Sequence, residues 1–438
     1  MSESQPQPSG GRFQTLRGMR DILSDDAAVY RHVEQTFWKI AERHGFAEIR
    51  MPVLERTELF TRSVGEATEL VHKEMYTFED RSGQSVSLRP EGTAGAARAY
   101  LEQGMGSLPQ PVKLGYCGNM YRYERPQAGR FREHEQFGLE AFGSSDPALD
   151  AQVILTCWQM LEELGIDRPS VQINSLGGPA SQKAIRKLIT DTAAPHEERL
   201  SDDARRQLRD NPLRMLDTKD PATREVVEQI PPLVDQLASE DREHLTAVLE
   251  YLDQAGIDYE LNPHLVRGFD YYTRTVFEFW GAAGADASLI GGGRYDGLIQ
   301  SLGGPATPAV GAGCGIYRIV EALKAKRGPK HYTKRSQVYL IQLGDVAKRH
   351  AFGLLGDLTK SDISVTASFG KEGIRSQLRQ ADKLGVSLAL IIGQKEAMEN
   401  SIIIRDMSSG MQETVPLKEA VAEVQSRLPK DVDRAASG

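Results

Sequence analysis

Arginines are concentrated around one turn in the first third of the chain. Two runs of alternating polar and apolar residues, between Val112 and Phe142, flank residues 126–129 (PQAG), a pattern typical of a β-hairpin. The cations of this turn are Arg122, Arg125, Arg130 and Arg132, with Glu124 among them. Planar guanidinium groups bind phosphate through paired hydrogen bonds, so the turn predicts a site for an anionic ligand.

The same hairpin has one polar face. Side chains alternate along a strand, so Arg122 and Glu124 project from one face of the first strand. The residues that share one face of the second strand are His134, Gln136, Gly138 and Glu140. A solvated outer face of an antiparallel sheet would give the same alternation. Three features favour a binding surface instead. They are the arginines, the carboxylates among them, and a glycine over which a bulky ligand could lie.

A second segment, residues 265–279 (LVRGFDYYTRTVFEF), brings Arg267 close to a pair of tyrosines, Tyr271 and Tyr272, at the start of an apolar strand. Core aromatic residues beside an ion-paired arginine are the alternative interpretation of this pattern.

Two glycine-rich segments follow. Residues 291–297 (GGGRYDG) permit close approach of a ligand to the backbone, or simply form a flexible turn. Residues 311–319 (GAGCGIYRI) place three glycines on one strand face before a helix that Arg318 opens. Ile316 occupies the third glycine position of the GxGxxG fingerprint, so a dinucleotide-binding fold is not supported.

Helical periodicity surrounds these segments. Apolar residues at helical spacing predict a helix over residues 25–44, with Ser24 as its N-cap and Gly45 as its stop. Residues 178–258 show helical periodicity and no strand pattern, which predicts an inserted helical module. This module holds 11 Lys and Arg against 17 Asp and Glu, a balance of −6.

Composition predicts the remaining boundaries. Residues 1–12 are expected to be a disordered tail and residues 429–438 a second tail, and residues 13–177 with 259–325 form the core that carries the motifs. Cations around a Gly-Pro pair mark residues 326–336 as a basic linker. Alternating strand and helix patterns over residues 337–428 predict a small α/β domain.

Composition also limits the class of protein. The 438 residues carry a net charge of −8, which argues against a uniformly basic nucleic-acid binder. Cys117, Cys157 and Cys314 are few and far apart, which predicts a reducing, cytoplasmic compartment. No signal-peptide pattern, long apolar run or paired zinc-ligand motif occurs, so we expect no membrane span and no structural metal.

Taken in order, the motifs resemble those of the class II histidyl-tRNA synthetase family from Leu16 to Leu428. The matching segments are LRGMRDIL, GFAEIRMPVLE, KEMYTFEDRSG, LRPEGTAG, YRYERPQAGRFREHEQFGLEAFG, LVRGFDYYTRTVFE, GGGRYDGL and PAVGAGCGIYRI. The resemblance implies an α+β fold, with an antiparallel sheet flanked by helices, a helical insertion and a C-terminal α/β anticodon-binding domain. It also implies a homodimer that uses ATP with Mg²⁺ to convert L-histidine to histidyl-adenylate, and then transfers histidine to the 3′ end of its tRNA.

Position by position, the resemblance assigns roles to single residues. Arg267 and Arg122 match catalytic arginines. ATP would contact Arg122, Glu124, Arg130 and Arg318, and histidine would contact Glu91, Thr93, Gln136, Glu140, Tyr271 and Tyr272. Gln127 matches the position that inspects the tRNA acceptor end. The histidine carboxylate is already ionised at neutral pH, so activation needs no general base, and no resident metal is expected.

The chain departs from the family pattern at two places, and two other functions stay open. Tyr317 stands where the family has an acid, and His134-Glu135 replaces an aromatic–His pair. One alternative is a synthetase-like, histidine-binding regulatory subunit of a phosphoribosyltransferase; such relatives lack the anticodon domain and the catalytic arginine region, whereas this chain keeps both. The other is a class II ligase for another amino acid, against which residues 268–278 and Glu140 argue.

Overall fold

The computed structural model describes residues 13–65, 68, 70–125, 129–166, 169–281, 288–333, 336–370 and 373–428. The chain divides into two compact units, one that ends at Tyr332 and one that begins at Thr333. Both predicted tails lie outside the described residues.

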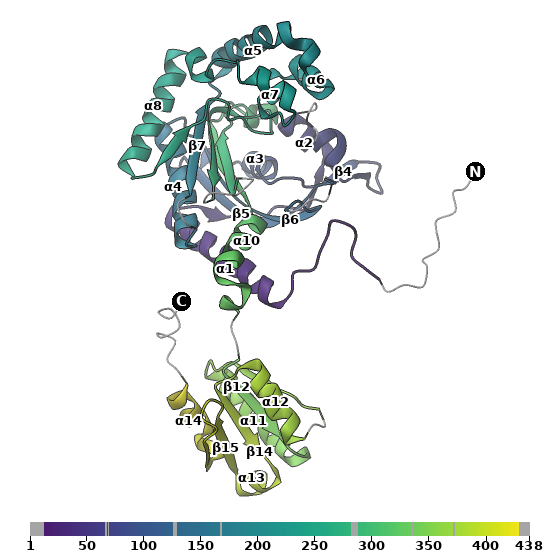
Figure 1. The fold of residues 1–438 in the computed structure, drawn as a ribbon, viewed down its shortest axis with the longest axis vertical. Helices are drawn as coiled ribbons and strands as arrows, with labels where there is room; N and C mark the ends of the chain where they lie inside the picture. Colours follow the sequence, from purple (N-terminus) through teal and green to yellow (C-terminus); the bar gives the residue numbers. More distant parts are fainter. Residues whose placement is uncertain are drawn as a thin grey trace, which may run out of the picture. The chain divides into compact units, whose positions relative to one another are not determined.

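An eight-stranded, mostly antiparallel sheet forms the centre of the first unit (Figure 1). In spatial order its strands are β1 (Ala47–Glu48), β5 (Val112–Tyr121), β6 (Glu133–Phe142), β11 (Ala309–Gly315), β10 (Ile290–Arg294), β9 (Thr273–Trp280), β7 (Ser170–Ser175) and β8 (Tyr259–Leu261). The pairs at the two edges, β1–β5 and β7–β8, are parallel. The predicted hairpin is confirmed as β5 and β6, with Val112 opposite Phe142 and Tyr121 opposite Glu133.

Helices α1 (Ser24–Arg43), α4 (Pro147–Glu163) and α10 (Ile316–Arg327) share one hydrophobic core with one face of this sheet. The apolar stripe of α1 is buried, and Phe37 packs on Phe137 of β6 with ring centroids 4.4 Å apart. The prediction of a helix over residues 25–44 is therefore confirmed, and Gly45 follows it at φ +79°. The prediction that Ser24 is the N-cap was wrong. Ser24 is the first helical residue, and the residue at the N-cap position, Leu23, makes no side-chain capping hydrogen bond.

The other face of the sheet packs against shorter helices and the helical insertion. The shorter elements of this core are α3 (Thr93–Glu102), η2 (Met105–Ser107) and α9 (Leu298–Ser301). Helix α2 (Thr57–Val64), which is followed by η1 (Leu70–Glu74), packs on α3 through a small separate core. The insertion consists of α5 (Pro179–Ala193), η3 (Ala194–Arg199), α6 (Asp202–Asp210), η4 (Pro212–Asp217), α7 (Pro221–Val227), η5 (Leu233–Gln236) and α8 (Ser239–Gln254). The connection after α10 contains η6 (Pro329–His331).

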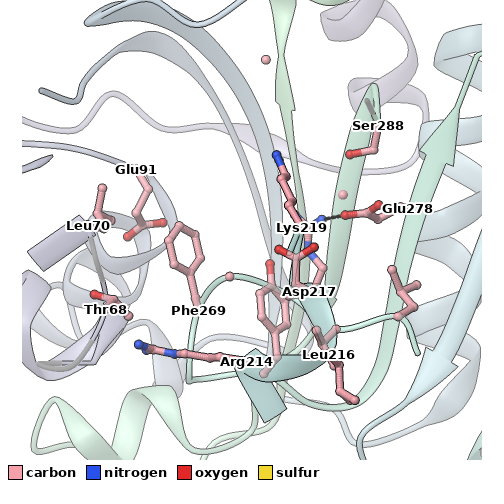
Figure 2. Close-up of a pocket in the computed structure, with 18 of the residues that line it drawn as sticks. Thr68, Leu70, Glu91, Arg214, Leu216, Asp217, Lys219, Phe269, Glu278 and Ser288 are labelled. Atoms are coloured by element: carbon pink, nitrogen blue, oxygen red, sulfur yellow. Dashed lines mark hydrogen bonds and ion pairs between the residues drawn. The ribbon is translucent and has the colours of Figure 1, made fainter. Parts of the chain in front are cut away.

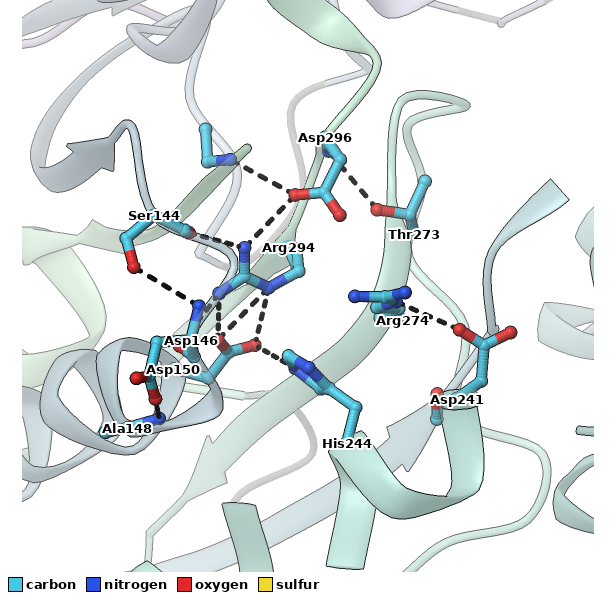
Figure 3. Close-up of polar contacts among 12 residues, drawn as sticks. Ser144, Asp146, Ala148, Asp150, Asp241, His244, Thr273, Arg274, Arg294 and Asp296 are labelled. Atoms are coloured by element: carbon cyan, nitrogen blue, oxygen red, sulfur yellow. Dashed lines mark hydrogen bonds and ion pairs between the residues drawn. The ribbon is translucent and has the colours of Figure 1, made fainter. Parts of the chain in front are cut away.

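A buried ion network ties β10 to the helices (Figure 3). The fully buried Arg294 donates through Nε to both carboxylate oxygens of Asp150, at 3.1 Å each, and through Nη1 to the Ser144 carbonyl at 2.9 Å. Burial alone would raise the pKa of Asp150, but a hydrogen bond from His244 and the charge of Arg294 lower it. The three glycines before Arg294 lie in strand β10, all of whose residues are buried, so the alternative interpretation of a flexible turn is wrong.

A small antiparallel sheet lies beside the main one, in the order β2 (Leu54–Arg56), β4 (Ser85–Leu88) and β3 (Thr77–Glu79). Leu54 pairs with Leu88, and Phe78 pairs with Val86. Paired residues and alternate residues of a strand lie on the same face, so these four apolar side chains share one face of the small sheet.

The second unit is a five-stranded mixed sheet with helices on both faces. In spatial order its strands are β13 (Val365–Ala367), β12 (Val338–Gln342), β14 (Leu388–Ile392), β15 (Ser401–Asp406) and β16 (Gln412–Pro416). Its helical elements are α11 (Asp345–Lys360), α12 (Ile374–Leu384), α13 (Gln394–Glu399), η7 (Leu417–Glu419) and α14 (Ala420–Arg427). Every residue of β12 is buried, because one core lies on each side of it.

The predicted α+β fold class is thus confirmed, including the separate C-terminal α/β unit. In the described part of the chain, none of the helices combines the length and the apolar character that crossing a membrane requires.

Candidate active site

A cavity of about 1300 Å³ opens in the first unit, between the sheet, the β5–β6 hairpin, the segment before β9 and the helical insertion (Figure 2). The predicted site residues that line it are Glu91, Thr93, Arg122, Glu124, Arg130, Gln136, Arg267, Tyr271, Tyr272 and Arg318. Glu140 is buried behind this lining, where it contacts Thr93 and Tyr295. Gln127 lies outside the described residues. Tertiary folding thus brings together residues that are up to 227 positions apart in the chain.

The space over Gly138 is filled by the protein itself. A side chain at Gly138 would collide with the phenol ring of Tyr116, so the prediction of ligand space over this glycine was wrong. The Tyr116 hydroxyl donates to Glu140 Oε1 at 3.1 Å and accepts from Gln136 Nε2 at 3.3 Å. Tyr116 therefore connects two of the predicted histidine-binding residues.

Glu140 is the most deeply buried of the predicted site residues. Its Oε1 accepts hydrogen bonds from Thr93 Oγ1 at 2.7 Å and from the Tyr116 hydroxyl, and its Oε2 accepts one from the Tyr295 hydroxyl. Burial raises the pKa of Glu140 to about 8, although the hydroxyl donors oppose this shift. The carboxyl group can therefore gain or lose a proton near neutral pH, which suits a ligand ring that does the same.

Glu91 caps helix α3. Its two carboxylate oxygens accept from the backbone N–H groups of Thr93 at 2.7 Å and Ala94 at 2.8 Å. Burial raises the pKa of Glu91, and these backbone bonds oppose the rise. Each carboxylate oxygen has a second lone pair, so Glu91 can still accept from a ligand amine.

Arginines dominate the hairpin end of the cavity. Arg122 Nε donates to the Pro90 carbonyl at 2.8 Å, Arg130 Nη1 donates to Glu124 Oε2 at 3.5 Å, and Arg318 Nη1 donates to the Ser288 carbonyl at 2.6 Å. Burial, together with the charges of Arg122 and Arg318, lowers the pKa of His134 to about 3, so this histidine is neutral. Burial and the charge of Arg130 also lower the pKa of Arg318. Cations that disfavour one another in this way attract an anionic ligand.

Arg267 is paired with Glu278 of β9, and both side chains are largely buried. A side chain at Gly291 would collide with the Arg267 guanidinium, so this glycine makes room for Arg267. Sequence reasoning missed Glu278; its signal was a carboxylate within the apolar second half of the strand, on the face it shares with Val276 and Trp280.

Sequence reasoning also missed Tyr116, Tyr295 and the turn of the insertion around η4. No motif marked Tyr116, which reads as one apolar position in a strand. Tyr295 belongs to the GGGRYDG segment, but only the fold directs its hydroxyl to Glu140.

The Tyr317 departure changes the packing at the edge of the cavity. Its ring lies 4.9 Å from that of Phe131, edge to face, and the Arg20 guanidinium lies over both rings, 4.2 Å from Phe131 and 4.4 Å from Tyr317. Such cation–π contacts hold the first turn of α10 against the hairpin. Arg318 still lines the cavity beside this cluster.

Known protein families match both units of the chain. A family model described as histidyl-tRNA synthetase matches residues 18–319, and one described as anticodon binding domain matches residues 337–427. Histidine–tRNA ligase of Halorhodospira halophila is 44% identical over 93% of this chain and 97% of that protein. The corresponding ligase of Desulforamulus reducens is 41% identical over 94% of this chain and 98% of that protein.

Solved structures agree with the sequence relatives. The apo histidyl-tRNA synthetase of Staphylococcus aureus superposes with a TM-score of 0.79 at 32% identity, covering 94% of this chain and all of that one. An ATP phosphoribosyltransferase regulatory subunit/histidyl-tRNA synthetase from Bacillus halodurans has a TM-score of 0.65 at 21% identity, covering 88% of this chain and 99% of that one, a likeness of fold alone. With a family model over most of the first unit and relatives above 40% identity along nearly the whole length, the chain belongs to the histidyl-tRNA synthetase family.

Proposed function

We infer that the chain is an ATP-dependent ligase that activates L-histidine and transfers it to tRNA. The observation that carries this inference is the division of one cavity into two chemically different ends. Arg122, Arg130 and Arg318 supply cations at one end. Glu91, Thr93 and Tyr272 line a polar pocket at the other, with Glu140 buried behind Thr93. A nucleoside triphosphate suits the first end, and a small polar amino acid suits the second.

Histidine recognition is proposed for the buried end. Glu140 and Tyr272 would face the two imidazole nitrogens, while Glu91, Thr93 and Gln136 would bind the α-amino group and Tyr271 would pack beside the ligand. A pocket whose buried polar groups require partners rejects apolar amino acids, because those ligands leave the groups unsatisfied.

Activation joins the two ends at Arg267. A carboxylate oxygen of histidine attacks the α-phosphorus of ATP; the new O–P bond forms as the bond to the bridging oxygen breaks, and pyrophosphate leaves. Arg267 and Arg122 would stabilise the negative charge that develops on the α-phosphoryl oxygens, which is electrostatic catalysis. The terminal ribose hydroxyl of tRNA then attacks the histidyl carbonyl carbon, and AMP leaves.

Mg²⁺ is proposed to enter as part of the ATP substrate. Its preferred ligands are carboxylate, phosphate and water oxygens, and Glu124 places a carboxylate beside the cations of the hairpin. Within the described residues, no group of three or more His, Cys, Asp or Glu side chains could hold a metal on its own.

A cytoplasmic homodimer is proposed as the working form. The small sheet supports this proposal, because its apolar face includes Leu54, 47% exposed, and Phe78, 48% exposed, close to Val53 at 40%. An exposed apolar face of this kind is typical of a subunit interface. Light scattering coupled to size-exclusion chromatography would give the mass, and a monomer at micromolar concentration would contradict the proposal.

The activity is tested by ATP–pyrophosphate exchange with each of the twenty amino acids. We expect exchange that depends on histidine, followed by charging of histidine tRNA. Histidine binding without exchange in folded protein would instead indicate the regulatory-subunit function. Exchange that depends on another amino acid would show a different ligase.

A further inference from the structure

The segment that carries Arg267 belongs to no strand or helix. It runs from the end of β8 at Leu261 to the start of β9 at Thr273, and its side chains form much of the site. Arg267 pairs with Glu278, and the ring of Phe269 lies 5.8 Å from the Arg122 guanidinium and 5.4 Å from the Tyr271 ring. Its position therefore depends on such side-chain contacts, together with single backbone hydrogen bonds.

Asp270 lies in the middle of the segment and is held by the helical insertion. Arg214 donates from Nε to Asp270 Oδ1 at 3.0 Å and from Nη2 to Oδ2 at 2.6 Å, and Asn211 Nδ2 donates to Oδ1 at 2.7 Å. On the opposite side, the Asp270 backbone N–H donates to the Val64 carbonyl at 3.3 Å. A side chain at Gly65 would collide with the Asp270 carboxylate, so these groups are closely packed. Two parallel charge-assisted bonds fix orientation as well as distance.

The insertion presents these donors from a rigid turn. Asn211 directly precedes η4, and Arg214 lies within it. Three other residues of η4, Leu213, Met215 and Leu216, are buried in the core shared with the sheet. The Arg214 side chain is 15% exposed and the Asp270 side chain 31% exposed.

The same turn also reaches the catalytic charges. Asp217 and Lys219 line the same cavity as Arg267, and Figure 2 shows their two side chains there. Burial raises the pKa of Asp217, while the charges of Lys219 and Arg267 oppose the rise. One short turn of the insertion therefore contacts the catalytic segment at Asp270 and faces Arg267 through Asp217.

We propose that Asn211, Arg214 and Asp270 form a clamp through which the helical insertion positions Arg267 for amino-acid activation. The proposal rests on the ligase function inferred above. It makes Arg214 and Asp270 positioning residues, which act through Arg267, and it gives the insertion a part in the first chemical step.

Kinetics of ATP–pyrophosphate exchange test the clamp in the full-length protein. Arg214→Ala and Asp270→Asn should each lower kcat by about ten- to a hundredfold while the KM values for histidine and ATP change by less than about twofold. Arg214→Lys should recover little of the loss, because an ammonium group lacks the planar fork. The matched control is Arg199→Ala, which removes an exposed ion pair with Glu225 in the same insertion and should leave exchange unchanged.

A double variant separates positioning from a general loss of structure. In an Arg267→Ala background, adding Arg214→Ala should cost no further activity, because the clamp acts through Arg267. An additional loss in that background would overturn the proposal, as would wild-type kcat in Arg214→Ala or in Arg214→Lys.

Hydrogen exchange gives a measurement that does not depend on activity. Amides of residues 265–272 should exchange faster in Arg214→Ala and Asp270→Asn than in wild type and in Arg199→Ala. Unchanged exchange would show that the segment is held without the clamp. If the wild-type chain showed no histidine-dependent activity, the ligase proposal would fail, and this measurement would still decide the clamp.

Discussion

Burial sets the charge state of the polar groups that would recognise the ligand. Glu140 has three hydroxyl donors, each of which favours the ionised carboxylate, yet its removal from water is the larger effect and raises its pKa to about 8. His134 shows the converse: burial beside two arginines keeps the imidazole neutral, with a pKa of about 3. Neither charge state follows from the residue type.

The Glu140 pKa makes the stability of the ligand-free protein depend on pH. The folded pKa lies above the unfolded value, so the folded state retains the proton longer and its stability decreases as pH rises from about 5 to about 8. Glu140→Gln cannot ionise, so its free energy of unfolding should lack this pH-dependent component. The difference in stability between wild type and Glu140→Gln should therefore change with pH. Urea unfolding of both proteins between pH 5 and pH 9 measures the difference, and a difference that stays constant with pH would refute the prediction.

Arg267 is expected to stabilise the transition state more than either substrate. Arg267→Ala should lower the rate of adenylate formation by about a hundredfold or more, because a preorganised charge next to the reacting phosphorus is removed. Histidine binding, measured by calorimetry, should change little. Equal losses in binding and in rate would show that Arg267 holds the substrate instead.

At the scale of elements, the buried Arg294–Asp150 pair connects β10 to α4, and His244 adds α8 to the same network. The network fixes the end of β10, and the next residue, Tyr295, donates to Glu140. A structural ion pair in the core thus supports a polar pocket on the other side of the strand.

Removing one partner of this pair should be costly. Arg294→Met leaves the Asp150 carboxylate buried without its main partner, and we expect a loss of about 3–5 kcal/mol in the free energy of unfolding. Lys187→Ala, which removes an exposed ion pair with Asp191, should cost no more than about 0.5 kcal/mol. Urea denaturation measures both, and a similar small loss for the two variants would contradict the expected role of the network.

At the scale of the whole molecule, each unit has its own hydrophobic core and its own sheet. All described residues that line the cavity belong to the first unit. The acidic insertion and the cationic hairpin also show that a net charge of −8 averages over surfaces of opposite sign. Local potential, and not the total charge, governs where a phosphate binds.

A variant that ends at Tyr332 should separate the two reactions. It keeps the whole cavity, so histidine-dependent ATP–pyrophosphate exchange should persist. Charging of tRNA should decrease by at least about a hundredfold, because the unit that matches an anticodon-binding domain is lost. Aminoacylation at the full-length rate would show that the second unit contributes nothing to tRNA binding.

The sequence by itself determined the order of the elements, the hairpin, the α+β class and ten of the residues that line the cavity. These depend on local periodicity and on motifs that are contiguous in the chain, such as the arginines around residues 126–129. The GGGRYDG segment shows the limit: three glycines suit a flexible turn or a strand equally well, and only their neighbours decide between the two.

Tertiary structure alone decided which groups meet. Tyr116 fills the space over Gly138, Glu278 pairs with Arg267, and Arg214 of the insertion reaches Asp270, 56 residues away in the chain. Long-range pairing, burial and the pKa shifts that burial causes depend on the packing of distant segments. No local pattern encodes them, because the same residue has a different charge and partner in each environment.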